Sequence, residues 1–588
     1  MEEMMEFWKK RKVYIVSIIH FVISCIHSGA FFSPIRENVG IENVAYKWCE
    51  TGVTLRNDIF SRSLCWIYSH MLAAVLIFVF WSWVFFIIHI WKTHSIKRTY
   101  IGILLSLIII GIFIIAAIYP ATITSASDTS YNYVYAKEWL PMYWHGFLTN
   151  VVHCACILTF FHPVSMSVIP FLFGINLISY FTYHTVIKYT KQRKLVKTMV
   201  WGIWLLLMPE TFQLLTYAGR NYMYAILSVS VFGILLKDYL EKEKLSAKKF
   251  IVLSFLVICL AVWRSEGLLY LIFYPFFLYF TYFYKRKVFW KKKKILQGII
   301  YIGVLYLILA FPDKYGNEKY QGYDYFIINT PGPLSAVLIN EKANFSYKNA
   351  DKDLDKINDI VPLEYIKKYG SNATACYNLD NLRLTRQCDA GNKGKEYVIA
   401  SYRALLYNWP IYFEYQINLF GNSIGFPRVF QLTTVDFEEW NTSQNDVKKW
   451  RDWLMDYYSI GEDDMSQNYD IVFFSKKFDK ALSKVIYWGV SKSHEFGWRI
   501  LNIFKIPITF LVIAVSIISY RKREWIYTIL GVFTIAIFTV IVLTAPTIRE
   551  NYYYSVYFNQ YWFLVFAWFQ AKKNGIRMPD IVEKREAI

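Results

Sequence analysis

Charged residues lie at the ends of this chain's apolar runs, where they could act on a phosphate-linked substrate. Asp128 lies in a polar segment that follows one apolar run, and Arg264 lies between two others. Arg549 precedes the last run. An arginine can stabilise charge on a departing phosphate, and a carboxylate can accept the proton of an attacking hydroxyl. We therefore expect Asp128 to be a general base, and Arg264 and Arg549 to bind the phosphate.

Further candidates join this site through the predicted topology. His145 is a candidate helper in proton transfer or acceptor binding, and Arg220 is a third candidate phosphate ligand. Tyrosines can line a sugar pocket by stacking and by hydrogen bonding. The residues that we expect in the substrate pocket are Glu210, Glu266, Tyr552 and Tyr553.

Each assignment has a purely structural alternative. Asp128 is surrounded by Ser and Thr residues and could be an ordinary polar loop residue. His145 could be an interfacial histidine, and Glu210 beside Pro209 could be a turn residue. The pairs that could form helix-end ion pairs without chemistry are Arg264 with Glu266 and Arg549 with Glu550.

The composition indicates a membrane protein. The chain has 588 residues, of which 55% are hydrophobic, and its apolar runs reach the roughly twenty residues that a helix needs to cross a bilayer. We therefore expect an all-α polytopic fold with about twelve transmembrane helices. The expected spans are 13–32, 64–90, 100–119, 165–187, 196–214, 221–239, 249–263, 266–284, 296–311, 501–519, 525–544 and 552–570.

The net charge of +20 does not indicate nucleic acid as a partner. The basic residues instead set the orientation of the chain in the membrane. Basic residues cluster in short loops between apolar runs, as cytoplasmic loops do, and a basic soluble domain is missing. With Lys9 to Lys12 inside, the later basic clusters also fall inside, so both termini are expected to be cytoplasmic. The buried polar residues then lie on the outer side. The Lys-, Ile- and Tyr-rich style is typical of a bacterial cell membrane protein.

Two segments are not expected to cross the membrane. A crossing at 143–161 would put the basic 188–197 loop outside, so we expect 131–161 to form interfacial helices on the outer face. His145, Asn150 and His153 make this stretch more amphipathic than a span. The polar segment 312–500 is long enough for a small, mainly α-helical extracellular domain. The expected division is therefore 1–99, 100–311, 312–500 and 501–588.

The cysteines fall into two groups. Five of them (Cys25, Cys65, Cys154, Cys156 and Cys259) lie in or beside apolar runs and are expected to be packing residues. Cys376 and Cys388 lie in the polar segment and could pair if it faces an oxidising space. The sequence leaves that pairing open.

The order of several short motifs resembles a known family. These motifs are Tyr119-Pro120, Ser127-Asp128, Trp144-His145, Arg264 to Leu268, and Ala545-Pro546 with Arg549 and Tyr552. This order is similar to that of the GT-C superfamily of integral membrane glycosyltransferases. Val361 to Tyr365 and Trp409 to Tyr412 resemble the extracellular insert of a poorly characterised bacterial subgroup.

The resemblance implies a GT-C-like transmembrane core at 100–311 and a catalytic acidic residue that maps to Asp128. It also implies a polyprenyl-phosphate sugar donor, inversion at the anomeric carbon, and an extracellular glycan or lipid acceptor of the cell envelope. It leaves a divalent metal open. Two departures stand out: Gly146 rather than proline follows His145, and Arg220-Asn221 stands where many members have an acidic residue.

Other functions remain alternatives. A lipid-linked sugar flippase or transporter usually needs polar groups near the membrane midplane and related halves, and the sequence shows neither. An envelope glycan polymerase or ligase would share the same outer site. An inactive scaffold would account for the departures from the family pattern.

Overall fold

The computed structural model describes most of the predicted spans and part of the polar segment. It covers residues 2–27, 58–93, 95–125, 146–161, 164–187, 220–284, 292–316, 330–369, 391–423, 507–544 and 553–573, with isolated residues between 136 and 143. All regular elements within these ranges are helices. The expected all-α class is therefore confirmed for this part of the chain.

Six helices within the described ranges are long and apolar enough to cross a membrane, so the chain has the architecture of a multi-pass membrane protein. They lie in α3 (Ile59–Thr93), α7 (Ser165–Thr182) with the π turn η4 (Tyr183–Ile187), α10 (Arg220–Glu241), the composite η5–α12–η6, α13 (Lys292–Gly316) and α23 (Trp525–Thr544). The composite consists of η5 (Ser265–Gly267), α12 (Leu268–Leu278) and the π turn η6 (Tyr279–Phe283).

The other described spans are also helical. They are α1 (Glu2–His27), α4 (Ser95–Ser125), α11 (Ala247–Trp263), the helix Pro507–Arg521 and α24 (Tyr554–Lys573). The expected span 196–214 lies outside the described residues. α13 leaves Ile299 and Leu307 exposed, as a lipid-facing helix does.

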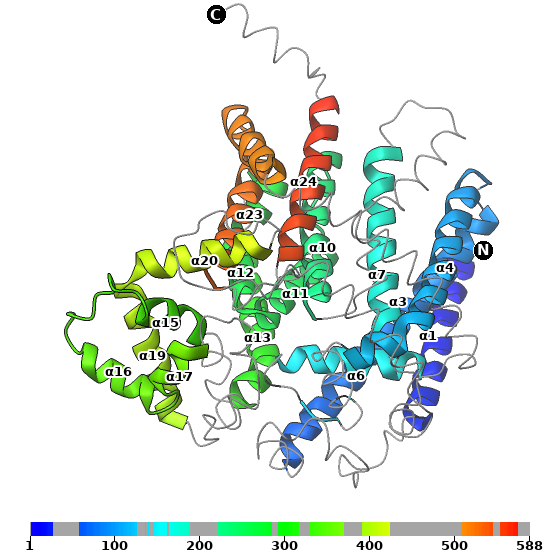
Figure 1. Ribbon diagram of the computed structural model, residues 1–588. Coiled ribbons are helices and arrows are strands. Elements are labelled where there is room, and N and C mark those ends of the chain that lie inside the picture. The colour runs from blue at the N-terminus through cyan, green and yellow to red at the C-terminus, as the bar shows by residue number, and fades with distance from the viewer. Residues whose placement is uncertain are drawn as a thin grey trace, which may run out of the picture.

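The centre of the bundle is α24, which lies alongside α10 (Figure 1). Trp562, Phe563 and Phe566 of α24 are buried, and so are its polar residues Asn559 and Gln560. These two amides make α24 less apolar than α23. They are accommodated because the helix is enclosed by protein rather than by lipid.

The predicted interfacial stretch contains a more deeply buried helix than expected. α6 (Phe147–Phe160) lies crosswise to α7 and α24 in Figure 1, as a helix parallel to the membrane plane would. It packs against α1, α3 and α7, however, and its Asn150 and His153 side chains are buried. These polar groups, which suggested an amphipathic surface helix, therefore face protein instead.

A separate group of helices forms within the polar segment. It consists of α15 (Pro331–Leu338), α16 (Ala350–Asn358), α17 (Leu363–Tyr369), α19 (Gly391–Tyr407) and α20 (Trp409–Ser423), which share an apolar core around Val337, Ile357 and Tyr397. We call this group the helical domain. Asn408, between α19 and α20, donates a hydrogen bond to the Asn344 carbonyl (3.1 Å). This bond holds the α19–α20 turn against the segment between α15 and α16.

Candidate functional site

The hairpin tip between α11 and α12 carries a buried ion pair. α11 ends at Trp263, and Arg264 continues in an extended conformation into η5. The Arg264 Nε lies in contact with the Glu266 carboxylate, and the two side chains are only 7% and 6% exposed. Arg264 also donates to the Asn221 side chain and lies over the Tyr224 ring. The tip is thereby bound to the first turn of α10.

Gly267 allows this tip to fold back on α11. A Cβ at Gly267 would lie 1.8 Å from the Leu260 carbonyl oxygen, which is backbone and cannot move aside cheaply. The close approach of the Leu260 carbonyl therefore requires glycine at the last position of Arg264-Ser265-Glu266-Gly267. Without it, the carboxylate and the guanidinium could not meet in the same way.

Arg220 and Asp313 extend the cluster to the first residue of α10 and to α13. The Trp263 indole donates a hydrogen bond to the Arg220 carbonyl (3.1 Å), which joins α11 to the start of α10. Arg220 interacts electrostatically with the carboxylate of Asp313, near the end of α13. We call Arg220, Asn221, Arg264, Glu266 and Asp313 the charged cluster.

Asp313 also accepts a hydrogen bond from the Phe147 backbone N–H (2.6 Å) and so stabilises the start of α6. An acidic group at a helix N-terminus satisfies an unpaired N–H and interacts favourably with the helix dipole. The sequence reasoning missed Asp313. Its signal was an acidic residue directly after Pro312, at the end of an apolar run.

Gly146 explains one departure from the family pattern. It precedes α6 with a φ of 90°, whereas proline is restricted to φ near −65°. A Cβ at Gly146 would lie 3.9 Å from both the Trp263 carbonyl oxygen and the Asp313 carboxylate, so α6 begins beside the charged cluster. The chain here requires a conformation that a proline could not adopt.

The structure brings together three of the predicted site residues, namely Arg220, Arg264 and Glu266. Tyr553 is buried in aromatic packing with Phe420 of α20 and Phe538 of α23. The predicted residues that lie outside the described part are Asp128, His145, Glu210, Arg549 and Tyr552.

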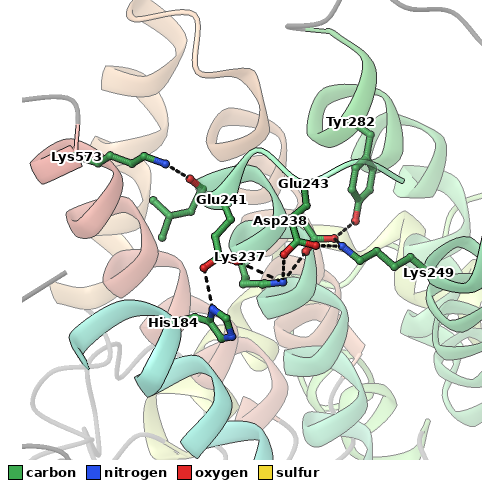
Figure 2. A network of polar contacts seen from close by, with 9 residues as sticks. His184, Lys237, Asp238, Glu241, Glu243, Lys249, Tyr282 and Lys573 are labelled. Carbon is green, nitrogen blue, oxygen red and sulfur yellow. Dashed lines mark hydrogen bonds and ion pairs between the residues drawn. The ribbon is translucent and has the colours of Figure 1, made fainter. Parts of the chain in front are cut away.

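A second polar cluster lies at the opposite end of α10 (Figure 2). Lys237 contacts the carboxylates of Asp238 (3.2 Å), Glu241 (3.5 Å) and Glu243, and the Lys249 Nζ lies 2.8 Å from Asp238. The side chains of Lys237 and Asp238 are 7% and 1% exposed. We call this group, with its neighbours below, the Lys237 network.

Both π turns contribute a side chain to the Lys237 network. His184 of η4 lies 2.8 Å from Glu241, and the Tyr282 hydroxyl of η6 donates to Asp238 (2.6 Å). Lys573 at the end of α24 donates to the Leu240 carbonyl. The expectation that the buried polar groups gather at one side is therefore wrong. Lys249, from one of the basic loops that set the orientation, is itself partly buried against the Asp238 carboxylate.

A smaller polar group lies inside the bundle, about one to two helical turns from the end that carries the charged cluster. The Asn559 amide donates to the Ser228 hydroxyl (2.6 Å) and to the Tyr270 hydroxyl (3.2 Å), and all three side chains are fully buried. The Asn559 amide thereby joins α24 to α10 and α12. The group lies on the same side as the charged cluster, so it does not contradict the expectation that the middle of the spans is free of polar groups.

The described residues include no group of three or more His, Cys, Asp or Glu side chains that could hold a metal ion. The five cysteines expected to pack in the apolar core are buried and unbridged, whereas Cys376 and Cys388 lie outside the described part. The charged cluster can bind anions through its arginines or stabilise its own helices through its ion pairs.

Fold and site together define a multi-pass α-helical membrane protein with a charged cluster at one end of its bundle. Comparisons with protein-family models, with curated proteins and with solved structures find no match. The resemblance to the GT-C superfamily thus rests on the sequence motifs alone.

Proposed function

We propose that the protein is a glycosyltransferase of the bacterial cell membrane. It transfers a sugar from a polyprenyl-phosphate carrier to an extracellular glycan or lipid of the cell envelope, with inversion at the anomeric carbon. The proposed topology has about twelve spans, cytoplasmic termini and an extracellular 312–500 segment. The motif order and the basic loops support this proposal.

One observation carries the proposal furthest: the arginines of two helix ends converge with carboxylates at the same end of the bundle. Arg220 and Arg264 are joined there through Trp263 and Asn221. A lipid-linked phosphate would reach such a site from the bilayer surface. The two guanidinium groups there, which pair with Glu266 and Asp313 in this structure, are the groups proposed to bind it.

The roles proposed for the individual residues come from the sequence motifs and from the resemblance to the GT-C superfamily. Asp128 accepts the proton of the acceptor hydroxyl, and His145 assists it. Arg264, Arg220 and Arg549 bind the donor phosphate, and Glu266 holds Arg264 in position. The pocket includes Glu210, Tyr552 and Tyr553. Because Tyr553 is buried against Phe420, its proposed contribution is to shape the pocket wall rather than to touch the sugar.

The test is turnover of polyprenyl-phosphate-linked sugars by the purified protein in lipid nanodiscs, with release of polyprenyl phosphate as the readout. Removing a general base costs about 10²–10⁴-fold in rate, so Asp128→Asn should lose transfer to that extent while donor binding persists. Ser127→Ala is the matched control and should keep wild-type turnover. Transfer by Asp128→Asn at a near wild-type rate would show that the base assignment is wrong.

A flippase is the second candidate, because the Ser228–Tyr270–Asn559 group supplies polar side chains that are buried between the spans, inward of the charged cluster. Movement of a fluorescent polyprenyl-linked sugar across vesicle membranes, without formation of any transfer product, would favour it. A polymerase or ligase would instead transfer oligosaccharide donors in preference to single sugars.

A further inference from the structure

The turn between α19 and α20 exposes an unusual set of large apolar side chains. Leu406, Tyr407, Trp409 and Phe413 are between 46% and 66% exposed, although neighbouring residues of the same helices form the core of the helical domain. Trp409 and Phe413 are four residues apart on α20 and therefore share one face of that helix. Among the 15 residues of α20, Glu414 alone is charged. Water is a poor partner for such a face.

The position of α20 indicates which partner covers this apolar face. Its Tyr412 hydroxyl donates to the Leu543 carbonyl, one residue before the end of α23, and its Phe420 ring packs edge-on against Phe538 at 5.2 Å. Phe538 precedes Thr544 by six residues, so at 1.5 Å per residue Phe420 lies about 9 Å inside the end of a membrane span. Figure 1 shows α20 lying across the axes of α23 and α24.

These features match an interfacial helix. Such a helix lies in the membrane plane with its apolar face buried ~5–10 Å into the boundary between headgroups and acyl chains. Tryptophan and tyrosine are enriched at that depth, because their rings combine an apolar body with a polar group. The exposed ring of Trp409 and the neighbouring Tyr407 are residues of this kind.

We propose that Leu406, Tyr407, Trp409 and Phe413 insert into the lipid leaflet at the Thr544 end of α23. The helical domain is then held at two places, by α23 through α20 and by the bilayer through this apolar face. The occupant of the face is phospholipid rather than a protein or a glycan. This attachment does not depend on the chemistry proposed above, and it would keep the domain close to any lipid-linked substrate.

The first test uses the full-length protein in phosphatidylcholine vesicles with an environment-sensitive fluorophore at a single introduced cysteine. At Phe413→Cys, lipids with a spin label near the headgroup should quench emission more strongly than aqueous iodide does. At Lys352→Cys, on the exposed face of α16, iodide should quench more strongly. Stronger quenching by iodide at position 413, or shielding of that position from both quenchers, overturns the proposal.

A second measurement needs no substitution, so it does not depend on a variant that folds. A photoactivatable phospholipid should form adducts with peptides of α20, as it should with the lipid-facing residues of α13, and not with peptides of α16. Adducts on α13 without any on α20 overturn the proposal. Protection of α20 that appears only when a soluble glycan is added would identify the face as a glycan platform, which also overturns it.

Discussion

At the scale of single residues, the charged cluster depends on burial. Arg264 and Glu266 are both almost inaccessible to water, so each carries a desolvation penalty that the opposite charge of the other offsets most directly. Exposed ion pairs at helix ends contribute little, whereas this pair is buried. Burial makes the two residues interdependent, whether or not the guanidinium also binds phosphate.

Glu266→Gln should therefore destabilise the protein strongly. Removing one partner of a buried ion pair typically costs about 3–5 kcal/mol, because the other charge is left uncompensated. Unfolding by sodium dodecyl sulfate in mixed micelles measures the difference. The double variant Arg264→Met with Glu266→Leu should recover most of the loss. A double variant less stable than Glu266→Gln would contradict this account.

Asp313 offers a local prediction at the same scale. Asp313→Ala should release the Phe147 N–H and weaken the start of α6, and hydrogen bonds to charged groups contribute about 1.5–3 kcal/mol. Hydrogen exchange should become faster in the peptide that begins at Phe147. Lys314→Ala, at the exposed neighbouring position, is the matched control and should leave this exchange unchanged.

At the scale of elements, the Lys237 network connects helix ends that are distant in sequence. The π turn η4 brings His184 to Glu241, and η6 brings Tyr282 to Asp238. A π turn inserts an extra residue and so redirects the side chains that follow, which is one reason why such turns recur at functional sites. Here two of them converge on one buried carboxylate–lysine group.

The network predicts a specific pH dependence. Partial burial raises the pKa of Glu243, but hydrogen bonds and charges from Lys237 and Lys249 outweigh this effect and lower it to about 2 from 4.5. A depressed carboxyl pKa contributes stability above 4.5, and this contribution is lost as the pH falls toward 2. The stability difference between wild type and Glu243→Gln should thus be largest above pH 4.5 and shrink below it. Thermal unfolding in detergent across this pH range measures it. A constant difference would contradict the assignment.

At the scale of the whole molecule, α24 organises the bundle from its centre. Its Asn559 amide links three helices in a region that is otherwise apolar. Hydrogen bonds within membranes contribute about 0.6 kcal/mol each on average, so this group adds little stability in total. Its importance for function depends on which of the two proposed activities the protein has.

Asn559→Leu separates the two functions. Loss of its two hydrogen bonds should cost only about 1 kcal/mol in unfolding free energy. A glycosyltransferase with its site at the bundle end should keep most of its turnover in the nanodisc assay. Loss of sugar-lipid movement in vesicles by this variant, with normal folding, would instead support transport through the middle of the bundle.

The sequence was most informative where the physics is local. Long apolar runs must be helical in a bilayer, because every backbone polar group needs a partner within its own segment. The described helices accordingly follow the predicted spans closely. The Arg264-Ser265-Glu266-Gly267 tip was also recognisable, because its charged residues stand where two predicted spans follow each other almost directly.

Tertiary packing decided what the polar residues in those runs do. Asn150 and His153 suggested a surface helix, yet they are buried against other helices. Lys237 and Asp238 resembled the end of a span beside a basic loop, yet Glu243 of that loop contacts Lys237 and Lys249 contacts Asp238. Apolar length depends on the segment alone, whereas the partner of a buried charge depends on which helices meet. The sequence by itself therefore determined the helices and their approximate ends. The three-dimensional structure decided which groups from distant segments join these local ion pairs, as His184 joins Glu241 and Asp313 joins Arg220, because such contacts depend on which helices meet.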